Sequence, residues 1–579
     1  MTDVALLEND QPSAATSYVG TLFDKIEKII REHRQNDPDL YRLVEENKLI
    51  KSAKQAAMVE LKPVVAVANA PSQKEEPLYF KQYEQKQLKQ KIAANQNLIH
   101  EQVLATQAMI VPRTKACNAK QPYASVEGMK LDREDKLSAQ IKAWRSILPI
   151  LIKRFAKIAD PRRTKSVKHK ILVVMLYGLF AFIFRLSSRR EINRELSSAV
   201  IFENLQKLFP ELKSIPHADT LARVLEKINV KDIEKTHMQL INQLIRNKKF
   251  KTLLIAGCLP IAIDGTQKLY RDGELHDLRW LSRKVGNEES KQQYVYVLEA
   301  NIVFKNGLTI PLLTEYLKTD WSVLDSPEGK QECELVAFER LTKKLKGYFP
   351  RLKIMILGDA LFATQTILDR LSHYQWEHMI QFSRNKHKRF TELLNTKRKT
   401  AKPIPAKPYY RGRHQKFYWY NDVMCGDGLT LKKHLVNCIE EWHEVDKITG
   451  DIVIKHSQHQ WISSIKINIK NVYELCNLAA RKLGLIEDSI HTEKHRGYHY
   501  EHAYSYNFNA MQGFHLLMRL AHTVNALSEF TKKLKKWIKA QGCSAILKLI
   551  KETIFNPWLS QEWYENQHKM PIRLTLQLE

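Results

Sequence analysis

From Leu253 onward the sequence alternates short runs of β-forming residues with helical stretches, and this alternation restricts the fold more than any other feature of the chain. Asn306-Gly307, between the second and third runs, is a hairpin turn signal. Strands that alternate with helices are typical of α/β proteins. We therefore expect a three-stranded meander, a helix and two further strands, in the segments LPIAID, YVYVLEANIVF, LTIPLLTEYL, QECELVAFERLTKKLKGY, KIMILGDALFA and HMIQFSR.

Two of these predicted strands end in an aspartate. Asp264 closes the first apolar run and is followed by Gly265, and Asp359 follows the later run IMILG. A single Asp-Gly pair is an ordinary turn. Active sites of α/β sheets, however, lie at the carboxyl ends of the strands. If the two strands are neighbours, both carboxylates point into one pocket, where like charges need a cation between them.

Hard oxygen ligands without an accompanying Cys or His cluster favour Mg²⁺ or Mn²⁺ over zinc. Phosphodiester chemistry commonly uses two such ions, and a third carboxylate usually completes the site. We expect that carboxylate on a later helix, within LIEDSIHTEKHRGYHYEH. Glu487, His491 and Lys494 would share one helical face. Spacing alone leaves four acids open, namely Glu487, Asp488, Glu493 and Glu501.

The balance of charge predicts a polyanionic partner. The chain has 92 Lys and Arg against 63 Asp and Glu, for a formal charge of +29. Such an excess favours nucleic acid as the partner. Basic and aromatic residues near the two acidic regions could contact phosphates and stack on bases, although a solvated loop with an anchoring tryptophan explains the first group equally well. These candidates are Lys268, Arg271, Arg279, Trp280 and Arg283, and later Arg496 and Tyr498.

The cysteines and apolar runs predict a cytoplasmic protein, with the bacterial cytosol as the expected location. The seven cysteines are scattered, without a Cys-x-x-Cys pair, which suits a reducing compartment. The most apolar run, from Ile171 to Phe184, is 14 residues long. A bilayer needs roughly 20, so we expect a buried helix there and no membrane. The start MTDVALLEND lacks the features of a signal peptide.

Composition and periodicity divide the chain into six predicted parts. They are a polar helical or flexible N-terminal region (1–135), a helical domain expected to bind DNA (136–252), the first part of an α/β core (253–385), a β-rich insertion (386–462), the last part of the core with the glutamate-bearing helix (463–540) and a C-terminal tail (541–579).

Three blocks of this sequence resemble the catalytic blocks of insertion-sequence DDE transposases that carry a β insertion. The blocks are IAIDGTQ, ILGDALFA and the stretch from NVYELC to MRLAH, and the likeness covers about residues 150–530. In that family the third block has an Ile-Glu-Asn run, a lysine seven residues after the glutamate, then Gly-Tyr and Glu-His. The matching positions here are Ile486-Glu487-Asp488, Lys494, Gly497-Tyr498 and Glu501-His502.

The resemblance implies an α+β or α/β fold, with an RNase H-like mixed sheet flanked by helices, a β-rich insertion and a helical N-terminal domain. It also implies that Asp264, Asp359 and Glu487 are the catalytic residues and the ligands of two Mg²⁺ or Mn²⁺ ions. Lys494 would contact a DNA phosphate, and Arg481 matches an earlier basic position. The chain differs from relatives at Leu483 and Gly484, where they often have arginine and tryptophan, and at Asp488 in place of asparagine.

The expected activity is cut-and-paste DNA transposition by a polynucleotidyl transferase and endonuclease. Its partners would be double-stranded DNA, as terminal inverted repeats and target, and a second copy of the chain, because two DNA ends must be paired. Two alternatives remain open: a regulatory or inactive DNA-binding protein derived from a transposase, and a hydrolytic nuclease on the same core. A phosphoaspartyl phosphatase is disfavoured, since its loop needs an aspartate where this chain has Ala262.

Overall fold

The chain divides into two compact units, residues 1–90 and 91–579, and the fold below belongs to the second. Arg279, Trp280 and most of the predicted N-terminal region 1–135 lie outside the described residues. The computed structural model describes residues 78–105, 123, 125–272, 281–284, 291–320, 330–331, 333–400, 404–405, 410–425, 431–570, 572 and 574–576.

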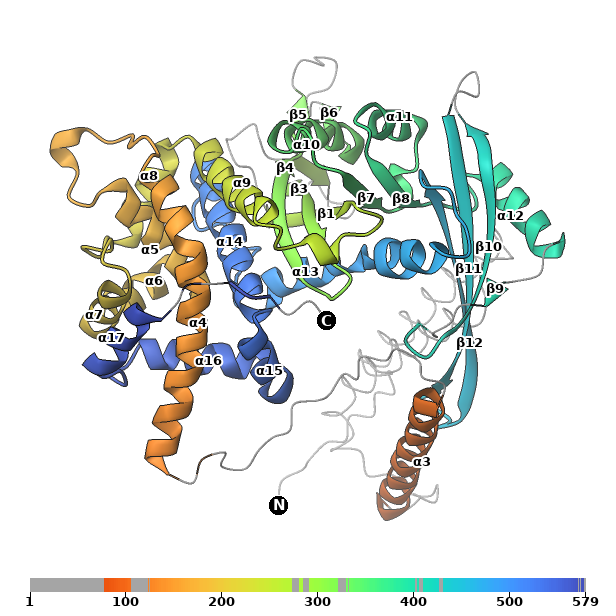
Figure 1. Cartoon of the computed structure of the whole chain (residues 1–579), viewed down its shortest axis with the longest axis horizontal. Helices are drawn as coiled ribbons and strands as arrows, with labels where there is room; N and C mark the ends of the chain where they lie inside the picture. The colour runs from red at the N-terminus through yellow and green to blue at the C-terminus, as the bar shows by residue number, and fades with distance from the viewer. Residues whose placement is uncertain are drawn as a thin grey trace, which may run out of the picture. The chain divides into compact units, whose positions relative to one another are not determined.

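A ten-stranded mixed sheet runs through the described part of the second unit (Figure 1). Its order is β2-β3-β1-β7-β8-β12-β11-β10-β9, and β4 pairs with β3 outside this path. The strands are β1 (Leu259–Asp272), β2 (Leu281–Lys284), β3 (Lys291–Val303), β4 (Thr309–Tyr316), β7 (Ile354–Gly358), β8 (Glu377–Gln381), β9 (Ile404–Pro405), β10 (His414–Cys425), β11 (Leu431–Val445) and β12 (Ile452–Ser463). A separate pair is formed by β5 (Thr319–Asp320) and β6 (Lys330–Gln331).

The predicted meander is confirmed, because β1, β3 and β4 pair in antiparallel fashion. The short β2, which the sequence did not predict, also pairs with β3. On the other side β1 pairs with β7 in parallel, and β7 with β8. All five residues of β7 are buried, as are the first five of β1. Central parallel strands are covered on both faces, which explains why both read as continuous apolar runs.

The β-rich stretch predicted at 386–462 continues the same sheet. The long strands β10, β11 and β12 form two antiparallel pairs, and β12 then pairs with β8. The stretch begins with a helix rather than a strand, because Lys388–Thr400 forms the basic helix α12 before β9. The predicted insertion is therefore joined to the core by backbone hydrogen bonds as well as by the chain.

The other main elements described in the second unit are helices, and α14 is central to them. It packs against α4, α5, α8, α9 and the strand β4. The helices are α4 (Val126–Phe155), α5 (Ile171–Ile183), α6 (Arg189–Leu196), α7 (Ala199–Leu208), α8 (Ala218–Lys227), α9 (Val230–Arg246), α10 (Glu334–Tyr348), α11 (Gln365–His373), α13 (Gly484–His495), α14 (Phe508–Glu529), α15 (Lys532–Gln541), α16 (Cys543–Ile554) and α17 (Gln561–Lys569), and the earlier α3 (Leu78–Ala105) crosses the unit boundary.

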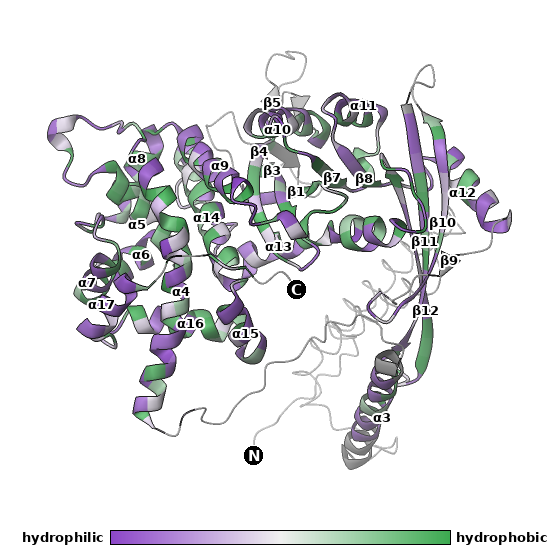
Figure 2. Ribbon diagram, viewed as in Figure 1, coloured by the Kyte–Doolittle hydropathy of each residue, from purple (hydrophilic) through white to green (hydrophobic). Residues whose placement is uncertain are grey.

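The apolar run at 171–184 forms α5, which is buried along almost its whole length and is mostly green, that is hydrophobic, in Figure 2. Gly178 allows its close packing: a Cβ at this position would lie 2.8 Å from a methyl group of Leu517 in α14 and 3.0 Å from one of Leu221 in α8. The prediction of a buried helix is confirmed. No helix among the described residues is both long and apolar enough to cross a bilayer.

Candidate active site

The two aspartates predicted at strand ends lie side by side in the sheet. Ala262 in β1 pairs with Leu357 in β7. Asp264 lies two residues after Ala262 and Asp359 two residues after Leu357, so the two aspartates are level, just beyond the part where β1 and β7 pair in parallel. The prediction that Asp264 ends its strand is wrong, because β1 continues to Asp272 through its pairing with β3. Backbone N–H groups hold both carboxylates. Gly265 N donates to Asp264 Oδ1 at 2.9 Å, and Leu361 N donates to Asp359 Oδ1 at 3.0 Å.

Glu487 comes from α13, a helix that packs on β1, β3 and β4, and its carboxylate acts electrostatically on Asp264. Burial raises the pKa of Asp264 to about 7, and the negative charge of Glu487 is the next largest cause. The N–H of Gly265 opposes this shift, whereas Asp359 and Glu334 add to it. The structure thus brings the three predicted acids into one electrostatic neighbourhood.

Glu334, the fourth acid in this neighbourhood, was not predicted from the sequence. It is the first residue of α10, and its Oε1 accepts a hydrogen bond from the Tyr296 hydroxyl at 2.8 Å. A Cβ at Gly265 would lie only 2.5 Å from Glu334 Oε1, so the glycine makes room for this carboxylate. Burial and the charge of Asp359 raise the pKa of Glu334, while the Tyr296 hydrogen bond opposes them. Because glutamate is common in the first turn of helices, the sequence gives no sign that Glu334 lies beside the other acids.

The four acids offer the donor chemistry that a hard divalent cation requires. Carboxylate oxygens are the ligands that Mg²⁺ and Mn²⁺ prefer. A cation would also remove the repulsion that raises the pKa of Asp264. As they stand, however, no three His, Cys, Asp or Glu side chains within the described ranges form a group close enough to hold a metal ion together. The carboxylate oxygens are of the type that such a cation binds, but in this structure they lie farther apart than the ligands of one bound ion.

The other three candidates for the third carboxylate have different positions. Glu493 is fully buried and paired with Arg519. Glu501 forms an ion pair with Lys494, whose Nζ is 3.0 Å from Glu501 Oε1. Asp488 lines a separate cavity of about 240 Å³. Of the four, only Glu487 is among the main influences on the pKa of Asp264.

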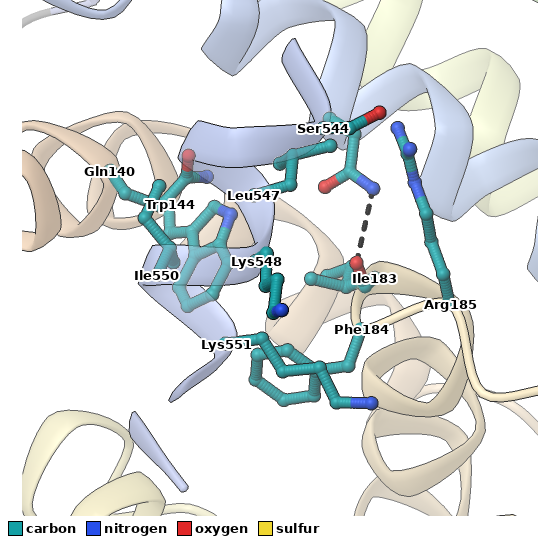
Figure 3. Close-up of a pocket in the computed structure, with 11 residues that line it drawn as sticks. Gln140, Trp144, Ile183, Phe184, Arg185, Ser544, Leu547, Lys548, Ile550 and Lys551 are labelled. Carbon is teal, nitrogen blue, oxygen red and sulfur yellow. Dashed lines mark hydrogen bonds between the residues drawn. The ribbon is translucent and has the colours of Figure 1, made fainter. Parts of the chain in front are cut away.

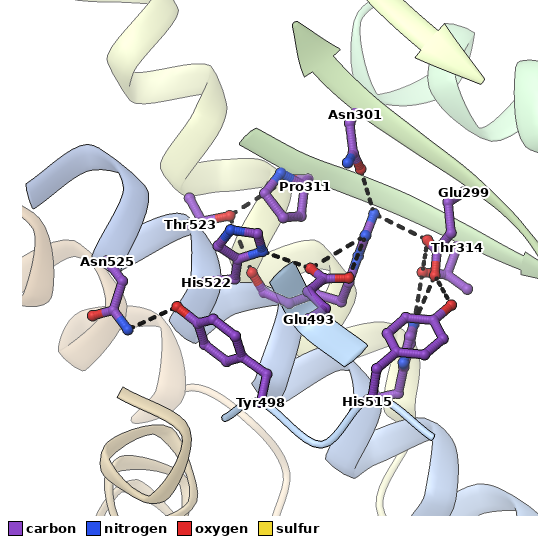
Figure 4. Close-up of polar contacts among 12 residues, drawn as sticks. Glu299, Asn301, Pro311, Thr314, Glu493, Tyr498, His515, His522, Thr523 and Asn525 are labelled. Carbon is purple, nitrogen blue, oxygen red and sulfur yellow. Dashed lines mark hydrogen bonds and ion pairs between the residues drawn. The ribbon is translucent and has the colours of Figure 1, made fainter. Parts of the chain in front are cut away.

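A buried ionic cluster fixes α13 on the sheet (Figure 4). Arg519 of α14 lies between two carboxylates, 3.2 Å from Glu493 Oε2 of α13 and 3.0 Å from Glu299 Oε2 of β3. Its Nη2 also donates to Asn301 Oδ1 at 2.7 Å. Each of these charged side chains is at most 1% exposed. Because Glu299 is the register partner of Asp264, the cluster ties the helix that carries Glu487 to the strand next to Asp264.

Further polar contacts complete this cluster. Glu299 accepts hydrogen bonds from the Tyr500 hydroxyl and from Thr314 Oγ1, both at 2.7 Å, and His515 Nε2 lies 3.1 Å from its Oε1. His522 Nδ1 lies 2.7 Å from Glu493 Oε1. Burial raises the pKa of Glu299, but Arg519, His515 and Thr314 outweigh this effect and keep it at about 2. Such a network was not visible in the sequence because its members are far apart along the chain.

Two predicted DNA contacts are corrected by their burial. Lys268 is 2% exposed, and its Nζ donates to the Tyr500 carbonyl at 2.8 Å. Tyr498 is fully buried, its hydroxyl accepts from Asn525 Nδ2 at 2.8 Å, and the Arg185 guanidinium lies over its ring. Neither side chain belongs to a surface that DNA could reach in this structure, and both are part of the packing around α13 and α14.

The remaining predicted DNA contacts are dispersed. Arg481 forms an ion pair with Glu440 of β11. Its guanidinium group is therefore bound to one of the long strands and not to the four acids of the candidate site. Arg496 and Arg271 are exposed, the latter near the end of β1. Arg279 and Trp280 lie outside the described residues, and Arg283 is in β2.

A cavity of about 200 Å³ in the helical part is separate from these residues (Figure 3). Trp144, Phe184 and Ile550 form apolar walls, and the side chains of Lys548 and Lys551 also line it. None of the predicted site residues is among its lining residues. Because none of the four acids lines this cavity, we do not assign it to the candidate active site.

Residues 152–241 match the family model described as DDE_Tnp_1-associated. The matched segment runs from the end of α4 through most of α9 and therefore lies in the helical part, outside the strands that carry the aspartates. No curated protein matches the chain. The family match points to a relation with DDE-type transposases.

Proposed function

We propose that this protein is a DNA transposase that cuts the ends of an insertion sequence and joins them to target DNA. The observation that carries the proposal is the level placement of Asp264 and Asp359 on adjacent parallel strands, with Glu487 brought to them by α13. An antiparallel meander followed by parallel strands supports an RNase H-like core. The match of residues 152–241 to a transposase-associated family supports the same conclusion.

In this proposal Asp264 and Asp359 hold two Mg²⁺ or Mn²⁺ ions, and Glu487 completes one of the two positions. When bound, such ions activate an attacking oxygen and stabilise the leaving oxygen of a phosphodiester. The residues of the chain orient the carboxylates. The N–H groups of Gly265 and Leu361 hold one oxygen of each aspartate, and the Arg519 cluster fixes the helix of Glu487.

The positive charge of the chain supports DNA as the partner, in addition to the acidic residues of the candidate site. A formal charge of +29 favours a polyanion. The substrate would be double-stranded DNA, first as the terminal repeats of the element and then as target. Cleavage by water would release a 3′-hydroxyl at the element end, and this hydroxyl would attack a target phosphodiester by in-line displacement. Pairing two ends requires two active sites, so we propose a homodimer in the DNA complex.

The test is a strand-transfer assay with the DNA that flanks the gene, in the presence of Mg²⁺. Wild-type protein should produce cleaved ends and joined products. Asp264→Ala and Glu487→Gln should bind the same DNA in a gel-shift assay and yield neither product. Retained cleavage by Asp264→Ala would refute the assignment, and cleavage without joining by the wild type would indicate a nuclease.

A further inference from the structure

A cleft of about 1130 Å³ lies where β1, α6 and the segment after α13 meet. Its walls include the end of β1 around Tyr270, the start of α6 at Arg189 and Arg190, and residues 501–506. The volume exceeds the range of about 300–1000 Å³ that is usual for sites of single small molecules. The cleft therefore has room for an extended ligand.

Two tyrosine rings in this cleft face solvent. Tyr270 is 59% exposed and Tyr506 is 56% exposed, although large aromatic side chains are usually well covered in a folded protein. The Arg271 guanidinium lies 4.8 Å from the centre of the Tyr506 ring. An exposed aromatic face beside an arginine is the pattern that binds bases and phosphates of a single strand.

Cations prevail among the charged groups of the cleft once the ion pairs are taken into account. Two of its acids are already paired: Asp219 lies 3.3 Å from Arg189, and Glu501 lies 3.0 Å from Lys494. The remaining charged lining residues are Arg190, Arg271 and Glu226. Phosphates in the cleft would lie beside Arg190 and Arg271, and the charge of Glu226 partly offsets these two arginines.

The cleft is connected to the candidate active site by a single strand. Asp264 and Tyr270 are both in β1, six residues apart. At about 3.3 Å per residue, the two positions are roughly 20 Å from one another, less the shortening at the bulge between Gln267 and Leu269. This is a span of several nucleotides, so a DNA strand cut at Asp264 could reach the two tyrosines.

We propose that this cleft binds unpaired nucleotides of the DNA strand next to the cleavage point, with bases stacked on Tyr270 and Tyr506 and phosphates at Arg190 and Arg271. The inference rests on the proposed function and adds a binding site for one form of its substrate. Unpaired bases are required because the faces of paired bases are covered by their neighbours in the duplex. The cleft would hold the strand end open while the acids act on the phosphodiester.

The test uses a duplex of the flanking DNA with a short overhang that contains 5-iodouracil, mixed with the full-length protein without divalent metal. Irradiation should attach the overhang to the peptides that contain Tyr270 or Tyr506, as identified by mass spectrometry. Tyr270→Ala and Tyr506→Ala should each weaken overhang binding by about tenfold, because stacking on one ring is lost. Tyr270→Phe and Tyr506→Phe keep the ring and should bind as the wild type does.

The matched control is Tyr420→Ala, which removes another exposed tyrosine, on β10. It should leave overhang binding unchanged, and all variants should bind the fully paired duplex equally. Cross-links elsewhere, or equal losses for duplex and overhang, would overturn the inference. Failure of the proposed function would look different: cleavage would be absent in the metal-dependent assay, whatever the position of the cross-links.

Discussion

The Asp264 carboxylate lies beside Glu487, Asp359 and Glu334, and burial together with these charges raises its pKa to about 7 from the usual 3.8. The folded state therefore binds this proton more tightly than the unfolded chain does. Its contribution to stability is complete at a pH below 3.8 and is lost as the pH rises to about 7. Above that pH the ionised carboxylate destabilises the folded protein unless a cation neutralises the cluster.

Asp264→Asn should therefore stabilise the metal-free protein at high pH. We expect its melting temperature to exceed that of the wild type by roughly 2–4 °C at pH 8, with a much smaller difference at pH 5. Added Mg²⁺ should raise the melting temperature of the wild type and have little effect on the variant. Scanning calorimetry at both pH values measures this. The control Asp369→Asn removes an exposed acid on α11, and an equal gain for both variants would contradict the argument.

At the scale of elements, the position of α13 depends on the buried cluster of Glu299, Arg519 and Glu493. Removal of one member of a buried ion pair leaves an uncompensated charge and costs about 3–5 kcal/mol. Arg519→Met should therefore lower the free energy of unfolding by about that amount in urea denaturation. The triple variant Glu299→Gln, Glu493→Gln, Arg519→Met should recover part of the loss, because it removes all three charges of this cluster together. Wild-type stability in the single variant would show that the cluster contributes little.

The strands could be predicted from the sequence because their signals are local: the apolar runs before Asp264 and Asp359 form the start of β1 and the whole of β7. The extension of β1 to Asp272 was not predicted, because it depends on pairing with β3. The burial of the Lys268 side chain could not be predicted from the sequence. Alternation along β1 would keep Lys268 on the same face as Asp264 and Thr266, but a bulge between Gln267 and Leu269 interrupts the register. The ammonium group is instead buried against the Tyr500 carbonyl, a partner 232 residues away.

The same distinction applies to the acids. Asp264 and Asp359 carry a local signal, an acid directly after an apolar run. Glu487 could be distinguished from the other candidates only by a family resemblance, because spacing alone also left Asp488, Glu493 and Glu501 open. Glu334 looks like an ordinary helix start, and its place beside Gly265 depends on how α10 folds back over the meander. Long-range packing decides such positions.

For the whole molecule, the excess of positive charge should dominate DNA affinity. A protein that neutralises 6–10 phosphates loses about 10³–10⁵ in affinity between 50 and 200 mM salt. We expect the basic helix α12 to make part of this contact. It follows β8, which is parallel to β7, so the chain enters α12 from the edge of the sheet where Asp359 lies. Its exposed last turn contains Lys397, Arg398 and Lys399.

Replacement of Lys397, Arg398 and Lys399 by glutamine should make the plot of log affinity against log salt shallower by about 2–3, since each phosphate contact contributes roughly 0.9. The matched control replaces Lys532, Lys533 and Lys536, which are exposed on α15 after α14. Both variants lose three charges, so a general loss of attraction would affect them equally. Fluorescence anisotropy over a salt series distinguishes the two cases, and equal slopes would place the DNA away from α12.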